Sequence, residues 1–246
     1  MTWHESDLNT FAGKRVIITG ATSGLGFETA LRFATVGAQL LVTARDDRKA
    51  AILETALAAV TTNKAEFVPL DLADLSSVHS AADALVASGD PIDVLINNAG
   101  IMIPPYAETV DGYELQIGTN HLGHFAWTAR LWPILSAARV VTLASLAHTA
   151  VNSIDLDSLT PQGAQRSYRP WRSYAESKLA NLLFSSELNR RIQNSGGTAV
   201  SVAAHPGVSA TSLMTTGPAL AGENLVSRAV TLGGRLIGQA PEFGVL

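Results

Sequence analysis

Short apolar runs alternate with longer stretches of helical periodicity along most of the chain. The apolar runs are rich in Val, Ile and Leu, and they have the length of strands that are covered on both faces. They occupy 16–19, 39–43, 66–70, 92–96, 139–143 and 198–203. The helical stretches occupy 25–36, 46–60, 76–87, 113–135 and 173–193. This alternation predicts right-handed crossovers between parallel strands, and therefore an α/β fold with helices on both faces of its sheet.

Two stretches that follow predicted strands have the composition of loops. One covers 151–172 and contains Pro161 and Pro170, and the other covers 205–222 and begins with Pro206 and Gly207. Ligands of an open parallel sheet bind beyond the carboxyl ends of its strands, so both loops are expected at the binding edge. No change of composition and no linker divides the chain, so 1–246 is predicted to form a single domain.

The composition narrows the classes of partner and of site. The net charge is −4 and no cluster of Lys or Arg occurs, so nucleic acid is not an expected partner. The absence of cysteine excludes disulfides, thiolate nucleophiles and zinc sites built on sulfur. The chain begins with a polar stretch, and no window reaches the roughly 18 uncharged apolar residues that a membrane helix needs. We therefore expect no membrane anchor and a cytoplasmic protein.

The first predicted strand runs directly into a glycine-rich turn that opens the first helix. Its residues include Gly20, Ser23, Gly24, Leu25 and Gly26. Glycines permit a tight turn and a close approach of the backbone to a pyrophosphate, and the start of a helix offers free N–H groups to an anion. A plain strand-to-helix turn is the alternative interpretation, but the position between strand and helix favours a dinucleotide site.

Six ordered motifs resemble the short-chain dehydrogenase/reductase superfamily. The turn has the spacing Thr-Gly-x-x-x-Gly-x-Gly, and the later motifs follow in the order of that family. They are Asn98-Ala99-Gly100 after the fourth strand, Asn120 in the long helix, Ser145 at the end of the fifth strand, Tyr174 with Lys178 in the next helix, and Pro206, Gly207, Val208 and Thr211 after the sixth strand. The resemblance spans 14–211. It implies a doubly wound, Rossmann-like parallel sheet in three α/β/α layers, and an enzyme that moves a hydride between a nicotinamide and a carbonyl/alcohol pair.

The end of the second strand bears on the choice of cofactor. NAD-dependent enzymes usually place an acidic residue there, whereas this chain has Ala44 followed by Arg45, which can pair with a 2′-phosphate. We therefore expect NADP(H) in preference to NAD(H), with Asp46 and Asp47 capping the next helix. By the resemblance, Asp71 and Leu72 contact the adenine, and Asn98 braces the sheet near the adenosine ribose.

Tyr174 and Lys178 lie four residues apart, and so on one face of a helix. The lysine cation, together with an oxidised nicotinamide, is expected to lower the pKa of the phenol, so that Tyr174 exchanges a proton with the substrate oxygen. Ser145 would hydrogen-bond that oxygen, and Lys178 would also hold the nicotinamide ribose. By the resemblance, Asn120 bends its helix and binds a water of the proton relay. Tyr168 is excluded as the acid, because Arg172 stands four residues further on.

Each of these residues also has an ordinary structural interpretation when it is taken alone. The histidines are interpreted as structural or pocket-lining, because they lack the spacing of metal-ligand pairs and the family needs no metal. They are His121, His124, His148 and His205.

Longer strings around Asn98, Asn120, Ser145 and Ser177 resemble the branch that contains retinol dehydrogenases and protochlorophyllide reductases, a branch that tends to use NADP. The resemblance implies a small carbonyl or alcohol substrate and a homodimer or homotetramer. An apolar pocket is suggested by side chains that could equally be core: Ile103, Tyr106, Tyr168, Trp171, Leu213 and Met214. A last helix and strand are expected beyond Leu246. Two other functions stay open, which are a non-catalytic NADP-binding redox sensor and an NADPH-dependent reductase of carbon–carbon double bonds.

Overall fold

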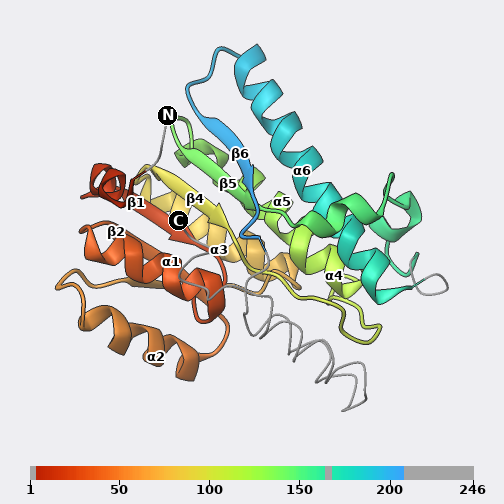
Figure 1. Ribbon diagram of the computed structural model, residues 1–246, viewed down its shortest axis with the longest axis horizontal. Coiled ribbons are helices and arrows are strands. Elements are labelled where there is room, and N and C mark those ends of the chain that lie inside the picture. Colours follow the sequence, from red (N-terminus) through yellow and green to blue (C-terminus); the bar gives the residue numbers. More distant parts are fainter. Residues whose placement is uncertain (1–3, 164–167, 208–246) are drawn as a thin grey trace.

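Six parallel strands form one sheet in the order β3-β2-β1-β4-β5-β6 (Figure 1). In this computed structural model, residues 4–163 and 168–207 are described. The strands are β1 (Arg15–Ile18), β2 (Gln39–Ala44), β3 (Glu66–Pro69), β4 (Val94–Asn97), β5 (Arg139–Leu143) and β6 (Val200–Ala204). All six predicted strands are confirmed, with ends that shift by at most two residues. The strand order reverses between β1 and β4, and this switch point is where an open α/β sheet binds its ligand.

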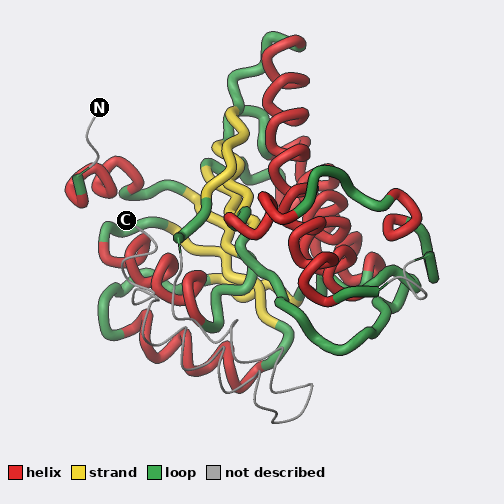
Figure 2. Tube along the Cα trace, turned by 45° about the vertical axis from the view of Figure 1, so that its right-hand side comes forward, coloured by secondary structure: helices red, strands yellow, loops and turns green. Residues whose placement is uncertain are grey.

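The helices lie on both faces of the sheet, so the three-layer α/β/α architecture is confirmed (Figure 2). The main helices are α1 (Gly24–Thr35), α2 (Asp47–Ala58), α3 (Leu75–Ser88), α5 (Gly123–Leu131) and α6 (Pro170–Asn194). Successive strand residues alternate between the two faces, as the pleat requires. Val16 and Ile18 of β1 pack with Phe33 of α1, whereas Ile17 packs on the opposite face with Trp127 of α5.

The predicted continuous helix over 113–135 is interrupted. A single helical turn, α4 (Leu115–Ile117), leads into a π-helical turn, η2 (Gly118–Leu122), before α5 begins. The N–H of Gly123 bonds to the carbonyl of Gly118, five residues earlier, which is the pattern of a π-bulge. Pro133 then lies in a 3-10 turn, η3 (Trp132–Ile134), because proline cannot donate the hydrogen bond that an α-helix needs. The π turn brings Asn120 to the functional edge.

Three short 3-10 turns were not predicted. They are η1 (Glu5–Phe11), η4 (Leu146–Ala150) and η5 (Leu156–Leu159). Phe11 at the end of η1 packs edge-on against Phe33, with 5.2 Å between the ring centres. A turn this short has no full hydrophobic period, so its sequence offers no helical signal. The predicted loop 151–172 therefore contains η5, and its last residues already belong to α6, which begins at Pro170.

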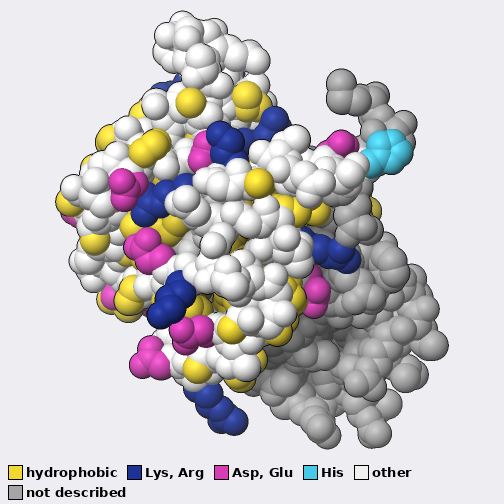
Figure 3. Space-filling view, turned by 90° about the vertical axis from the view of Figure 1, so that its left-hand side faces the viewer, with side chains coloured by type: hydrophobic (Ala, Val, Ile, Leu, Met, Phe, Trp, Pro, Cys, Tyr) yellow, Lys and Arg dark blue, Asp and Glu magenta, His cyan; other side chains and the backbone are white. Residues whose placement is uncertain are grey.

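Acidic and basic side chains lie interspersed on the face that Figure 3 shows. Some exposed side chains of opposite charge form ion pairs, such as Lys14 with Asp93 at 2.9 Å and Arg130 with Asp83 at 3.1 Å. Within residues 4–163 and 168–207, no helix is both long and apolar enough to cross a bilayer. The same described residues hold no group of three or more His, Asp or Glu placed to bind a metal.

Candidate active site

The glycine turn lies at the carboxyl end of β1 and leaves no room for side chains. Gly20 and Gly24 have φ angles of +68° and +56°, the left-handed region that favours glycine. A Cβ on Gly20 would lie 2.9 Å from the Cα of Ala99. A Cβ on Gly26 would overlap the carbonyl of Gly20 and lie 2.5 Å from Nδ2 of Asn98. The turn therefore packs closely against the loop that follows β4, and Gly20 and Gly26 cannot be replaced without a shift of these neighbours.

The start of α1 provides hydrogen-bond donors at this turn. Ser23 is the N-cap residue, but its hydroxyl makes no capping bond to the helix. The N–H groups of Gly24, Leu25 and Gly26 belong to the first turn, where they have no partner inside the helix. These donors and the positive end of the helix dipole suit an anion such as a pyrophosphate. The residues present therefore fit a dinucleotide.

Asn98 braces this turn against β4, as the sequence predicts. Its Nδ2 donates to the carbonyl of Thr19 at 2.7 Å. In return, the hydroxyl of Thr19 accepts the N–H groups of Asn98 at 2.9 Å and of Ala99 at 3.0 Å. Thr19 was not among the predicted site residues, although it opens the glycine-rich motif. The two motifs that flank the switch point are thus bonded directly to each other.

Arg45 and Asp71, both predicted to contact the nucleotide, pair with each other at the ends of β2 and β3. Nη1 of Arg45 lies 3.3 Å from Oδ1 of Asp71, and both side chains are exposed (62% and 40%). Asp46 caps α2 through the N–H groups of the two following residues. Asp47 occupies the first turn of α2 without a capping bond, so the expectation that both aspartates cap is right for Asp46 only. Leu72 is buried, and its side chain belongs to the core.

Tyr174 and Lys178 lie on the first turns of α6, and both are buried. Nζ of Lys178 lies 5.7 Å from the centre of the Tyr174 ring. The ammonium donates to the carbonyl of Leu143, at the end of β5, at 3.1 Å, and Nδ2 of Asn181 donates to the same carbonyl at 3.0 Å. Strand β5 thus anchors the lysine one helical turn from the phenol.

Asn120 joins the catalytic group to the loop after β4. Its Oδ1 accepts the N–H of Ile101 at 2.8 Å, and its Nδ2 donates to the carbonyl of Ile101 at 2.9 Å and to the hydroxyl of Ser177 at 3.0 Å. A Cβ on Gly100 would lie 3.2 Å from Oδ1 of Asn120 and 3.7 Å from Nζ of Lys178. The predicted residues Gly100, Asn120 and Lys178 therefore meet in space.

The protonation of the phenol depends on its surroundings in the protein. Burial raises the pKa of Tyr174, and a hydrogen bond with Ser145 opposes that rise. The expected lowering of this pKa by Lys178 together with an oxidised nicotinamide concerns the enzyme with its cofactor, and it stays a prediction. Burial also lowers the pKa of Lys178 to about 8, because it penalises the charged form of the amine.

Ser145 stands two residues after the end of β5 and caps η4. Its Oγ accepts the N–H of Ala147 at 3.2 Å, and this bond orients the side chain. Its hydroxyl hydrogen therefore stays available to the phenol or to a substrate oxygen. Pro206 and Gly207 follow β6, and Gly207 has a φ of +68°. Val208 and Thr211 lie outside the described residues, as do the rim residues Leu213 and Met214.

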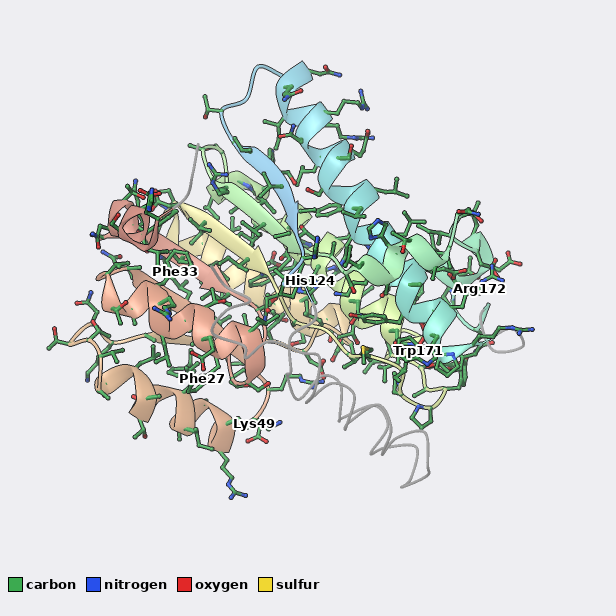
Figure 4. The ribbon with its side chains drawn as sticks, in the orientation of Figure 1. Phe27, Phe33, Lys49, His124, Trp171 and Arg172 are labelled. Atoms are coloured by element: carbon green, nitrogen blue, oxygen red, sulfur yellow. The ribbon has the colours of Figure 1, made fainter. Side chains whose placement is uncertain are left out.

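Tyr168 has a bridging role. Its hydroxyl donates to the carbonyl of Pro104 at 2.6 Å and accepts from Nε2 of Gln116 at 3.1 Å. Gln116 also accepts the N–H of Ile103 at 2.7 Å, and Ile103 has a φ of +48°, which is rare for a β-branched residue. Tyr106 packs edge-on against Tyr168, with 5.3 Å between the ring centres. These bonds connect the segment of Ile103 and Pro104 to Tyr168, which shortly precedes Tyr174 in the chain. Trp171, at the beginning of α6, is 55% exposed (Figure 4).

His124 is a residue whose contacts the sequence did not reveal. Its ring lies in the interior of the molecule (Figure 4), with Nε2 2.8 Å from Oγ1 of Thr19 and Nδ1 3.1 Å from the main-chain oxygen of Asn120. Burial lowers the pKa of His124 to about 3, and the charges of Lys178 and His121 act in the same direction. The spacing of four residues from Asn120 was the available signal, because residues four apart on a helix are neighbours.

Stability is expected to fall as the pH drops below about 6.5, the ordinary pKa of histidine. Burial lowers the folded-state pKa of both His121 and His124. Below about 6.5 the unfolded chain therefore binds protons that the folded chain does not, and each such group removes up to about 1.4 kcal/mol per pH unit. Urea unfolding between about pH 7.5 and pH 5.5 measures this slope, and ordinary carboxyl groups stay ionised over that range. A stability that does not change over this interval would contradict the assignment of two neutral buried rings.

Comparison with known proteins gives the family. The family model described as short chain dehydrogenase matches residues 14–154, which is more than half of the chain. This chain therefore belongs to the short-chain dehydrogenase family. It is also similar to curated retinol dehydrogenases, so the predicted branch is confirmed as well.

Three relatives illustrate the similarity. Human retinol dehydrogenase 13 is 42% identical over 208 residues, and mouse polyprenol dehydrogenase is 40% identical over 209 residues. These alignments cover 83% and 82% of this chain but 61% of each relative, so the chain spans about three fifths of their length. A solved structure of an uncharacterized protein from Mycobacterium paratuberculosis is 43% identical, with a TM-score of 0.74, and the match covers 96% of this chain and 78% of that one.

Proposed function

We propose that this chain is an NADP(H)-dependent oxidoreductase that interconverts the carbonyl and alcohol forms of an apolar small molecule. The observation that carries the proposal is the convergence of Ser145, Tyr174, Lys178 and Asn120 at the edge of the sheet that also presents the glycine turn. The printed names of the curated relatives, retinol and polyprenol dehydrogenases, support an apolar alcohol or carbonyl as the substrate.

Each side chain of the group has a distinct task. When bound, the nicotinamide supplies or accepts the hydride. In reduction, the phenol of Tyr174 donates its proton to the carbonyl oxygen, and in oxidation the phenolate takes that proton from the alcohol. Ser145 donates a hydrogen bond to the same oxygen, where negative charge develops.

Lys178 and Asn120 support the proton transfer. The burial that lowers the pKa of Lys178 to about 8 places its titration near neutral pH, which suits a group that passes protons. A ribose hydroxyl and the positive charge of an oxidised nicotinamide would supply the stabilisation of phenolate that the protein alone lacks. Asn120 holds the main chain of Ile101 through two hydrogen bonds. Gly100 lies beside Asn120 and Lys178, and any larger residue at this position would crowd them.

Turnover of a substrate panel tests the proposal. The panel contains all-trans-retinal, medium-chain aldehydes and simple ketones, and oxidation of NADPH is followed by absorbance while products are identified by mass and NMR. Reduction of a carbonyl supports the proposal. Saturable binding of NADPH without turnover of any carbonyl would favour the redox sensor, and a product reduced at a carbon–carbon bond would favour the double-bond reductase.

Exchange of Arg45 for glutamate is expected to reverse the preference for cofactor. The guanidinium of Arg45 follows β2 and pairs with Asp71 at 3.3 Å through Nη1. Its other N–H groups can donate hydrogen bonds to a 2′-phosphate. A carboxylate in its place repels that phosphate and accepts bonds from ribose hydroxyls. The ratio of kcat/KM for NADPH to that for NADH should fall at least about tenfold in Arg45→Glu.

Arg130→Glu is the matched control for this change. Arg130 is also an exposed arginine paired with an aspartate, Asp83 at 3.1 Å, but it lies on α5. Its exchange should leave the cofactor ratio within about twofold of the wild type. An unchanged ratio in Arg45→Glu would show that Arg45 does not select the cofactor.

The cytoplasmic location expected from the sequence stays a prediction.

A further inference from the structure

A buried chain of hydrogen bonds connects the dinucleotide turn to the π turn that carries Asn120. It runs from Thr19, at the end of β1, through the ring of His124 to the main-chain oxygen of Asn120. Thr19 and Asn120 are 0% exposed and His124 is 2% exposed, so water cannot replace these partners. The proposed function assigns His124 no task.

The partners of the ring determine where its proton lies. The hydroxyl of Thr19 already accepts two N–H groups, those of Asn98 and Ala99, so both lone pairs of its oxygen are used. Its one hydrogen can go to Nε2 of His124 at 2.8 Å, which is nearer than the carbonyl of Ile96 at 3.3 Å. A carbonyl can only accept, so Nδ1 donates to Asn120 at 3.1 Å. The ring is therefore neutral, with its proton on Nδ1.

Hydrogen bonds hold both the side chain and the main chain of Asn120. Its side chain is bonded to the N–H and the carbonyl of Ile101 and to the hydroxyl of Ser177. Its main chain is bonded through His124 to Thr19, the residue immediately before Gly20. A displacement of the dinucleotide turn therefore reaches Asn120 through two short, directional bonds.

We propose that His124 is a positioning residue, whose neutral ring sets the distance between the dinucleotide turn at Thr19 and the main chain of Asn120. Its bond to Thr19 keeps the turn in the shape that receives the cofactor. Its bond to Asn120 keeps that residue placed beside Lys178. This inference rests on the proposed function for its effect on turnover, whereas its effect on cofactor binding can be measured in the absence of any reaction.

Two amide substitutions separate the two bonds of the ring. The amide nitrogen of asparagine can take the place of Nδ1, so His124→Asn keeps the bond to Asn120 and loses the bond to Thr19. The amide oxygen of glutamine can take the place of Nε2, so His124→Gln keeps the bond to Thr19 and loses the bond to Asn120. Thr19→Val removes this bond from the other side, together with the bonds that the Thr19 hydroxyl accepts from Asn98 and Ala99, and Thr19→Ser restores the hydroxyl.

The dissociation constant of NADPH, measured by the fluorescence of the bound nicotinamide, is the first readout. We expect His124→Asn to raise it about tenfold, and Thr19→Val to raise it at least as much because two further bonds are lost. The double variant should raise it no further than Thr19→Val alone, because without the hydroxyl the ring has no bond to Thr19 left to lose. Thr19→Ser should recover most of the affinity that Thr19→Val loses. Effects of the two single variants that multiply in the double variant would overturn the proposed link.

The second readout is kcat with the carbonyl substrate. His124→Gln should keep the affinity for NADPH and lower kcat about tenfold, because Asn120 loses its main-chain anchor. His79→Gln, at a half-buried position on α3, is the control and should change neither quantity. If the His124 variants have lower Tm values but unchanged affinity and kcat, the ring has only a structural role and the proposal is wrong. If the wild type binds NADPH but turns nothing over, the proposed function fails, while the affinity measurements still decide whether the link exists.

Discussion

Tyr174→Phe is expected to lower kcat for carbonyl reduction roughly 10²–10⁴-fold, the usual contribution of a positioned general acid. The substitution removes one oxygen from a side chain that is 5% exposed, and phenylalanine fills the same space. The fold and the affinity for the cofactor should therefore persist. Because burial raises the pKa of this phenol, the protonated form is present at neutral pH and can act as the acid in reduction. Steady-state kinetics of both proteins with one aldehyde measure the effect.

Tyr168→Phe is the matched control for this prediction. Tyr168 stands six residues before Tyr174, but the bonds of its hydroxyl go to the carbonyl of Pro104 and to Gln116. Its loss should lower Tm, because Pro104 and Gln116 each lose a partner, and it should change kcat less than about tenfold. Comparable losses of kcat in the two variants, or full activity in Tyr174→Phe, would remove Tyr174 from its proposed role.

Gly26→Ala is expected to abolish measurable binding of the dinucleotide and to lower Tm. The new Cβ would overlap the carbonyl of Gly20, which is backbone, and lie 2.5 Å from Nδ2 of Asn98, which its hydrogen bond to Thr19 holds in place. The turn must open to admit the methyl group, which disturbs both the N–H groups at the start of α1 and the bonds of Asn98 to Thr19. Titration with NADPH and thermal unfolding measure the two effects.

A second glycine separates the effect on the site from the effect on stability. Gly89 ends α3 with a φ of +73°, and a Cβ there would meet open space. Gly89→Ala should cost about 1 kcal/mol of unfolding free energy through backbone strain, because alanine disfavours the left-handed region, and it should leave the affinity for NADPH unchanged. If Gly26→Ala binds NADPH as tightly as Gly89→Ala does, the cofactor does not sit at this turn.

The strands and the binding edge could be predicted because their signals are local. A run such as 94–97 is apolar throughout since both faces of β4 are covered, and the glycines of the turn stand where backbone meets backbone. Asn98, Tyr174 and Lys178 were found through ordered motifs whose members lie far apart in the sequence. The structure then places both Asn120 and Lys178 beside Gly100.

Other features depend on contacts that no local pattern encodes. Thr19 and His124 are 105 residues apart in sequence but bonded in the interior, and neither residue type is unusual at its position. The pKa of Tyr174 in the protein alone follows from the balance between burial and one hydrogen bond, and the four-residue spacing from Lys178 encodes neither of them. The break of the predicted helix 113–135 at η2 likewise results from packing, because a π turn contains the same kinds of residue as an α turn.

The π turn determines how far the helix that follows it, α5, is rotated about the helix axis. An α-helix turns about 100° per residue, so the one additional residue in the turn at η2 rotates α5 by about that angle relative to α4. Deleting a single residue between Gly118 and Leu122 would restore a regular helix and swing Trp127 and Leu131, both 0% exposed, away from the sheet. The additional residue of the π turn therefore has two effects. It places Asn120 at the site, and it directs the apolar side of α5 toward the sheet, so a change in this turn alters both.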